Sequence, residues 1–372
     1  MRQHLHRDSN SRASAKEMMC PGALLAVFIS FSPCADALPG NLNGDSSVKP
    51  LFASHALLAV TIEAPLTTLM KDRPNDEYLE GTFSYTAADG TQQTFDLKIR
   101  TRGNFRRQEE ICNFAPVRLN FRKKQLDDTE FVGQNKLKLV TQCQRNRPTY
   151  EQYVLREYLA YRILQLMTNK SFGVRLFHIN WVDTEGSKSR TKYGFVLEDV
   201  GDVAERIGME SIKIGDVAHA DLEPLQQNLV NVFQYLIGNT DYSLIRGPKP
   251  DDCCHNSKLL SATDGPPFTP LPYDFDFSGL VDARYAGTSP LFRLRNVRER
   301  LYRGQCSNSD LLPETFRQFL EQKDAIYAIV DELAMFTSDS RRSVIRYLDS
   351  FYDDITQPKT IALKFTDLCN QG

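Results

Sequence analysis

The first half of the chain alternates apolar and polar residues in the way that β-strands do. Residues 78–85 and 94–101 flank Ala88-Asp89-Gly90, a turn signal that predicts a hairpin. The other predicted strands in this half are residues 57–62, 117–121 and 136–140. Together these segments predict a twisted antiparallel sheet.

Helical periodicity follows the predicted sheet. Apolar residues recur at helical spacing over residues 150–167, and neither Gly nor Pro interrupts them. Two more strands, residues 177–182 and 193–198, are followed by helices at 225–237, 313–336 and 340–352, with an irregular stretch from 238 to 287. Runs of strands before runs of helices favour the α+β class, and a two-lobed arrangement would leave a cleft between the lobes.

The N-terminus has the three parts of a secretory signal. A basic start precedes an apolar run at residues 23–31, and Ala35-Asp36-Ala37 supplies a small-residue cleavage site. The alternative is a membrane anchor, but the run falls short of the ~20 residues that span a bilayer. We therefore expect residues 1–37 to be a signal peptide cleaved near Ala37, and the mature chain to be exported without a transmembrane segment. Residues 38–50 have the composition of a flexible leader, which leaves 51–372 for the folded domain.

Composition indicates an ordinary globular protein, with 41% hydrophobic and 25% charged residues. A net charge of -2 argues against nucleic acid as the main partner. Basic residues nevertheless cluster between Arg102 and Lys124. This stretch is either a local site for an anion or a solvated strand-and-turn surface, and the sequence leaves both interpretations open.

An exported chain would meet oxidising conditions, in which its six mature cysteines would tend to pair. We predict a disulfide between Cys112 and Cys143, because each cysteine lies at or just beyond the end of a predicted strand. The adjacent residues Cys253-Cys254 lack the C-x-x-C spacing with which two thiolates reach one zinc ion.

The irregular stretch carries the oxygen-bearing side chains that suggest chemistry. Mg²⁺, or Mn²⁺ in its place, binds oxygen ligands and usually takes one or two carboxylates together with substrate phosphates. Asn256 and Asp274 would supply those ligands, and Asp241 would accept a proton from an attacking hydroxyl. The alternative is structural, because Asp and Asn beside Gly commonly form caps and turns, and Asp276 would then simply cap the turn into Ser278.

The order of these motifs resembles the atypical kinases of the spore-coat protein CotH family. Asn239-Thr240-Asp241 is similar to the catalytic loop of that family, His255-Asn256 to its metal-binding end, and Asp274-Phe275-Asp276 to its second metal motif. Further matches, in the family's order, are Arg102-Gly103-Asn104, the P-x-R-L-x-F strand at 116–121, Leu137-Lys138-Leu139, the helix at 155–160 and the strand at 194–198. The resemblance thus covers roughly residues 100–279.

The resemblance implies a two-lobed, kinase-like fold with a strand-rich N-lobe at about 51–200 and a mainly helical C-lobe at about 201–372. It also implies transfer of a phosphoryl group from ATP to a hydroxyl of a protein or cell-surface acceptor, in which positioning and charge neutralisation do most of the work. Asp241 would be the catalytic residue, Asn256 and Asp274 would hold the metal, and Asp276 would reach a second ion. Glu198 would line the adenine end of the nucleotide site.

Two departures from the family bear on activity. The family tends to carry Lys before the P-x-R-L strand, where this chain has Phe114-Ala115, so Arg102, Arg118 or Lys138 would have to contact the phosphates instead. The segment between Asp241 and Asn256 is also longer than in the family. Two alternatives therefore stay open: a catalytically inactive, pseudokinase-like envelope protein that binds through the same cleft, and a metal-assisted phosphoesterase.

Overall fold

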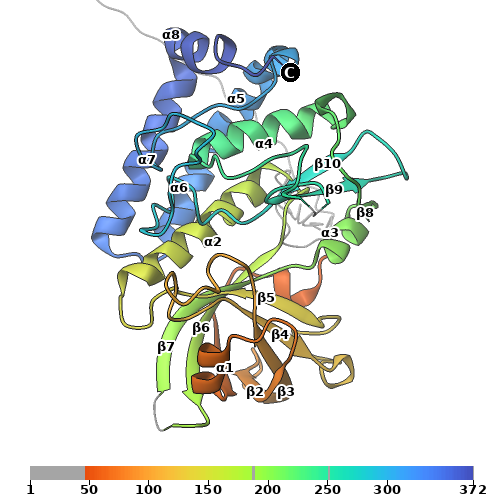
Figure 1. Cartoon of the computed structure of the whole chain (residues 1–372), viewed down its shortest axis with the longest axis vertical. Coiled ribbons are helices and arrows are strands. Elements are labelled where there is room, and N and C mark those ends of the chain that lie inside the picture. Colours follow the sequence, from red (N-terminus) through yellow and green to blue (C-terminus); the bar gives the residue numbers. More distant parts are fainter. Residues whose placement is uncertain (1–46, 187–188, 250–251, 372) are drawn as a thin grey trace, which may run out of the picture. The chain divides into compact units, whose positions relative to one another are not determined.

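The strands of the first half close into a seven-stranded barrel (Figure 1). The computed structural model describes residues 47–186, 189–249 and 252–371, and these described residues belong to one compact unit. Around the barrel the strand order is β1-β2-β3-β4-β5-β7-β6. These strands are β1 (Leu58–Ala64), β2 (Leu79–Thr86), β3 (Gln92–Thr101), β4 (Val117–Phe121), β5 (Lys136–Val140), β6 (Val174–Asp183) and β7 (Ser189–Leu197).

The barrel closes through β1 and β6, which run parallel with Leu58 opposite Phe177. Every other strand pair in the barrel is antiparallel. The predicted antiparallel sheet over residues 57–140 is confirmed, because β1 to β5 pair antiparallel with their neighbours; the parallel closure with β6 was not predicted. Alternation along a strand indicates which face is buried, but it does not specify the direction of the neighbouring strand.

Aromatic side chains fill the barrel. Phe83 lies at its centre, with ring centroids 5.3 Å from Phe121 and 5.1 Å from Phe131. Alternate residues of β4 are buried, which matches the period of two that predicted this strand. Closure pairs all strands, so the barrel exposes no free strand edge.

The helix α2 (Thr149–Met167) follows the first five strands and is buried along almost its whole length. Its residues Leu155, Leu159 and Leu164 belong to the same hydrophobic core as Phe233 of α4 (Pro224–Ile237) and Phe351 of α7 (Ser338–Thr356). The remaining helices are α1 (Leu66–Asp72), α3 (Val200–Arg206), α5 (Leu312–Glu321), α6 (Lys323–Glu332) and α8 (Pro358–Ile361). The described part of the chain is thus α+β, as predicted, with strands first and most helices afterwards (Figure 1).

One predicted helix is in fact two. The segment expected to be helical over residues 313–336 breaks at Gln322, which ends α5 and precedes α6. Neither Gly nor Pro marks this break, so the apolar periodicity continues across it and could not reveal it.

The stretch predicted as irregular, residues 238–287, contains a β-hairpin. Strands β9 (Ser257–Ser261) and β10 (Thr269–Pro272) pair antiparallel, and β8 (Glu210–Ile212) joins them in the order β10-β9-β8. Pro270 and Pro272 argue against a central strand, but β10 lies at the edge of this sheet, where a strand tolerates proline.

The cysteines of the described residues form disulfides. Cys112 pairs with Cys143 as predicted, Cys306 pairs with Cys369, and the neighbours Cys253 and Cys254 pair with each other. None of the described helices is both long and apolar enough to cross a bilayer. The disulfides are compatible with export. The predicted signal peptide and most of the predicted leader lie outside the described residues, whereas Val48 at the end of that leader is buried.

Candidate functional site

Asp241 lies on a loop that is fixed by the end of α4. Gly238 ends the helix in the left-handed conformation, with φ 64°, and a side chain there would collide with the hydroxyl of Tyr347. Asn239 then accepts a hydrogen bond through Oδ1 from the backbone N–H of Asp241, at 2.9 Å. These contacts hold the Asp241 backbone close to the core although the loop itself has no regular structure.

The β9–β10 hairpin brings Asn256 and Asp274 together. Asn256 immediately precedes β9, and Asp274 follows β10 by two residues; at this end of the hairpin Ser257 pairs with Pro272. The Tyr273 N–H donates to the carbonyl of Asn256 at 3.0 Å. Both Asn256 and Asp274 have positive φ, 50° and 63°. Such strain in non-glycine residues clusters at functional sites, so it points to the same place as the sequence motifs.

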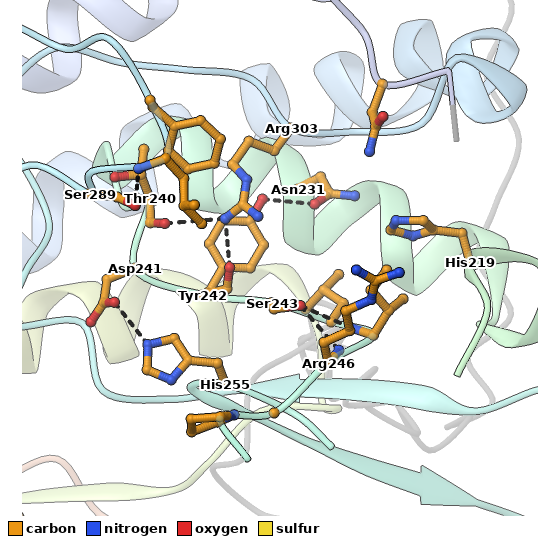
Figure 2. Close-up of a pocket in the computed structure, with 17 residues that line it drawn as sticks. His219, Asn231, Thr240, Asp241, Tyr242, Ser243, Arg246, His255, Ser289 and Arg303 are labelled. Atoms are coloured by element: carbon orange, nitrogen blue, oxygen red, sulfur yellow. Dashed lines mark hydrogen bonds and ion pairs between the residues drawn. The ribbon is translucent and has the colours of Figure 1, made fainter. Parts of the chain in front are cut away.

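Asp241, His255 and Asn256 form one hydrogen-bonded group. His255 Nε2 lies 2.8 Å from Asp241 Oδ1, as Figure 2 shows, and Asn256 Nδ2 donates to Asp241 Oδ2 at 3.0 Å. The hydrogen bond to Asp241 raises the pKa of His255, so the imidazolium form is favoured. Because its amide nitrogen donates to Asp241, Asn256 keeps Oδ1 as an acceptor for another group.

These residues line one wall of a cleft of about 720 Å³, and basic side chains line another. Arg102 follows β3, Lys138 lies on β5, and Lys258 lies on β9. Within the described residues none of the three makes an ion pair; Lys138 and Lys258 instead have their ammonium groups 5.1 and 5.7 Å from the ring centroid of Tyr273. Burial, followed by the charge of Arg102, lowers the pKa of Lys138 to about 8. The cleft therefore has three cationic side chains that form no ion pair within the described residues, although the charge of Asp274 acts on Arg102 and Lys138.

Asp276 lies deeper in the same cleft and is 5% exposed. Its Oδ2 is 3.5 Å from Arg106, which is also 3.9 Å from the buried carboxylate of Glu157 on α2. Burial raises the pKa of Asp276 to about 7, and the neighbouring charge of Asp274 adds to this effect. Asp276 thus shares one guanidinium with a second carboxylate and is less free to face the cleft than Asp274.

Six of the eight predicted site residues line this cleft: Arg102, Lys138, Asp241, Asn256, Asp274 and Asp276. Two do not. Arg118 lies on β4 directly opposite Lys138, and its charge contributes to the lowered pKa of Lys138 without lining the cleft. Glu198 is buried, where its carboxylate pairs with Arg206 at 3.0 Å and its backbone N–H donates to Gly173.

Sequence reasoning missed several residues of the cleft. Lys258 carries a signal that would have revealed it, since it stands two positions after Asn256 and alternate residues of a strand share a face. Glu157 on α2 does not line the cleft, but its buried carboxylate lies 3.9 Å from Arg106, which does. Tyr161, one turn after Glu157, accepts the backbone N–H of Asp274 at 2.8 Å and so ties the helix to the site.

No group of three or more His, Cys, Asp or Glu side chains is placed to hold a metal within the described residues. A cation bound here would rely on two protein oxygens, Asn256 Oδ1 and the Asp274 carboxylate, and would need further ligands from a substrate or water. Comparison with known proteins assigns no family, because no family model matches the chain and the search of curated proteins finds no significant match.

Proposed function

We propose that this protein is an exported, CotH-like kinase that transfers a phosphoryl group from ATP to a hydroxyl of a protein or cell-surface acceptor, with Mg²⁺ or Mn²⁺ as cofactor. One observation carries the proposal. Arg102, Lys138 and Lys258 make no ion pair within the described residues and line the same cleft as Asp241, Asn256 and Asp274. Unpaired cations opposite oxygen ligands suit a polyphosphate whose charge is shared between protein cations and a metal.

The proposed transfer needs only groups that the cleft contains together with the nucleotide. The acceptor oxygen bonds to the γ-phosphorus, and the bond from that phosphorus to the bridging oxygen breaks, which leaves ADP. Asp241 takes the proton of the acceptor hydroxyl on its carboxylate, while the hydrogen bond from His255 holds that carboxylate in place. Lys138 and Lys258 bind the phosphates, and Arg102 contributes positive charge beside Asp274.

Asn256 Oδ1 and the Asp274 carboxylate are the groups that would hold the metal. Their chemistry fits, because Mg²⁺ prefers hard oxygen ligands and commonly takes only one or two from the protein. When bound, the metal would neutralise phosphate charge and fix the phosphate orientation. Asp276 is the proposed contact to a second ion, although its pairing with Arg106 competes with that role.

The same proposal assigns the barrel to an N-lobe and the helices after it to a C-lobe, with Glu198 at the connection between them. Export would follow cleavage of the signal peptide near Ala37, and the disulfides support this because such bonds persist in oxidising compartments. The resemblance to CotH kinases supports the assignment through the order of the motifs.

A nucleotide-dependent thermal shift tests the proposal. A ligand that binds only the folded chain stabilises it by about 2.7 kcal/mol at a hundredfold excess over its Kd. We expect ATP with Mg²⁺ to raise the Tm by a few degrees, and Asp274→Asn to remove the part of the shift that depends on Mg²⁺. Asp127→Asn, which changes an exposed carboxylate in the connection between β4 and β5, is the matched control. Absence of a shift with every nucleotide and metal pair would rule the kinase out.

The second candidate is a catalytically inactive protein that binds through this cleft. It is favoured by the hydrogen bonds that occupy both carboxylate oxygens of Asp241, and by Phe114-Ala115, which are buried where the family carries Lys. This candidate predicts a thermal shift without transfer of labelled phosphate. A phosphoesterase would instead release inorganic phosphate without any acceptor, and would lose that release in Asp274→Ala.

A further inference from the structure

A second cavity of about 520 Å³ is lined by residues 240–248, the loop that carries Asp241. Asp241 and His255 line both this cavity and the cleft with Lys138, so they stand where the two spaces meet. Figure 2 shows Asp241 and His255 at one end of the second cavity, and His219 and Arg246 at the other. A molecule bound along it would therefore reach Asp241 from a space that the proposed phosphate-binding residues do not line.

Basic side chains outnumber acidic ones among the described residues that line this second cavity. Asp241 is the only acidic side chain among the described residues that line it, whereas Arg246 and Arg303 are both basic. The exposed guanidinium of Arg246 makes no ion pair or hydrogen bond within the described residues. The two arginines also act on His219: after burial, their charges are the causes that lower its pKa. Among the described residues that line that end, an anion would find cations and no competing carboxylate.

Arg303 is held rigidly. Its guanidinium lies 4.4 Å from the ring centroid of Tyr242 and 4.8 Å from that of Phe292, and it donates to the carbonyl of Thr240 at 3.1 Å. None of these partners is charged, so its positive charge is fixed in place but not neutralised. By contrast, Arg246 is free to reorient toward a ligand.

The rim of the cavity is apolar. Leu291 is 82% exposed and stands beside Phe292, and Ile245 and Pro248 complete this part of the lining. An isolated exposed leucine needs no explanation, but one at the mouth of a charged cavity offers contact to an apolar side chain. A peptide can supply an acidic group, a hydroxyl and an apolar group from successive residues, whereas a simple sugar acid lacks the last of these.

We propose that the second cavity is the acceptor site and that it selects a peptide segment in which a serine or threonine is flanked by acidic residues. The hydroxyl would lie at Asp241, and an acidic side chain would lie between Arg246 and His219. The role as acceptor site rests on the proposed kinase function. The preference for an acidic peptide rests on the cavity alone and is testable without nucleotide.

The first experiment measures peptide binding by fluorescence anisotropy on the full mature chain. The probes are labelled peptides with one serine flanked by glutamates, by glutamines or by lysines. We expect the glutamate peptide to bind at least about tenfold more tightly than the glutamine peptide, and the lysine peptide most weakly. Arg246→Glu should remove this preference, and Arg246→Gln should reduce it. Because Arg246 is exposed, both variants should fold, which the Tm of each would verify.

Arg342→Glu is the matched control, since it reverses an exposed arginine on α7 and changes the net charge equally. Equal binding of the three peptides, no binding of any, or the same loss in Arg342→Glu as in Arg246→Glu would overturn the proposal. A preference for the lysine peptide would overturn it as well.

The second experiment separates this proposal from the kinase assignment. With labelled ATP and Mg²⁺, the glutamate peptide should gain label only when it contains serine, and Arg246→Glu should raise its KM while kcat with saturating peptide changes little. If the peptide binds through Arg246 but no label is transferred and no nucleotide shift occurs, the kinase proposal fails and the peptide site stands. If label is transferred to the peptide but peptide binding does not depend on Arg246, the acidic-peptide site fails and the kinase proposal stands.

Discussion

Asp241 and His255 are joined by a contact of 2.8 Å between Oδ1 and Nε2, and this pair borders both the basic cleft and the second cavity. The carboxylate is oriented from two sides, because Asn256 donates to its other oxygen. A base placed between a phosphate site and an acceptor site needs such orientation, since proton transfer depends on hydrogen-bond distance and alignment.

Asp241→Asn should therefore separate chemistry from binding. The amide keeps the size of the side chain but cannot accept a proton, so we expect transfer of labelled phosphate to fall by about 10²- to 10⁴-fold. The Tm shift with ATP and Mg²⁺ should remain, because Asp241 is not a proposed ligand of the metal or the phosphates. Loss of both would show that Asp241 binds rather than reacts, and unchanged transfer would remove it from the mechanism.

The ion pair of His255 with Asp241 predicts a pH dependence of stability. The hydrogen bond raises the pKa of His255 in the folded chain above its ordinary value near 6.5. Its contribution to stability is then fully present below that ordinary value and is lost as the pH rises through the higher, folded pKa. The Tm difference between the natural chain and His255→Gln should be larger at pH 5.5 than at pH 8.5. Both side chains are partly exposed, so the difference should be small and should shrink in high salt.

The buried carboxylates around Arg106 predict a larger effect of substitution on the free energy of unfolding. One guanidinium faces the carboxylates of Asp276 and Glu157, so Arg106→Met would leave two buried acids without a cation. We expect a loss of about 3–5 kcal/mol in the free energy of unfolding, as for other broken buried ion pairs. Asp276→Asn should cost far less, because Arg106 and Glu157 then form a matched pair. Urea unfolding of both variants checks this, and equal losses would contradict it.

The raised pKa of Asp276 also predicts that the free energy of unfolding changes with pH. Its folded pKa of about 7 lies above the ordinary value of 3.8, so folding favours the protonated acid. The associated stability is present below pH 3.8 and is lost as the pH rises through about 7. Relative to Asp276→Asn, the natural chain should therefore lose unfolding free energy between pH 4 and pH 7. A flat difference over that range would show that Arg106 keeps Asp276 ionised.

Local sequence patterns predicted much of the fold, because the alternation that indicates a strand is contained in the few residues of that strand. Residues 117–121 and 136–140 are strands with the predicted bounds, since alternation and burial coincide there. The parallel closure of β1 with β6 depends on partners more than a hundred residues apart and leaves no local trace. The same distinction applies to β10, where two prolines concealed a strand that is tolerated only because it lies at an edge.

The candidate site was predictable where motifs end on the same hairpin. Asn256 and Asp274 come together because β9 and β10 pair, and both motifs were visible in sequence. Glu198 shows the limit of this reasoning. The resemblance to CotH kinases implied that it lines the adenine end of the nucleotide site, but Arg206 at the end of α3 pairs with its carboxylate. The second cavity was not predictable, because His219, Arg246, Arg303 and Asn370 meet there from distant parts of the chain.

Lys138 gives the sharpest test of the phosphate site, because binding and stability should change in opposite directions. Burial and the neighbouring Arg102 lower the pKa of Lys138 to about 8, so the empty cleft disfavours its charge. Lys138→Met removes that cost and should raise the Tm without nucleotide. The same change should weaken ATP binding by roughly tenfold or more, because a charge-assisted contact to phosphate is lost. Binding by the natural chain should also weaken as the pH rises through about 8 and Lys138 loses its proton.

Lys136→Met is the matched control for this test, since Lys136 is an exposed lysine two residues earlier on the same strand. Calorimetric titration with ATP and Mg²⁺ measures binding, and thermal unfolding without ligand measures stability. If Lys138→Met lowered the Tm and left ATP binding unchanged, Lys138 would be a structural residue held by Tyr273, and the phosphates would have to bind elsewhere. Of these two lysines, only Lys138 lines the cleft. If both variants weakened binding equally, the effect would therefore reflect the general positive charge of the barrel surface.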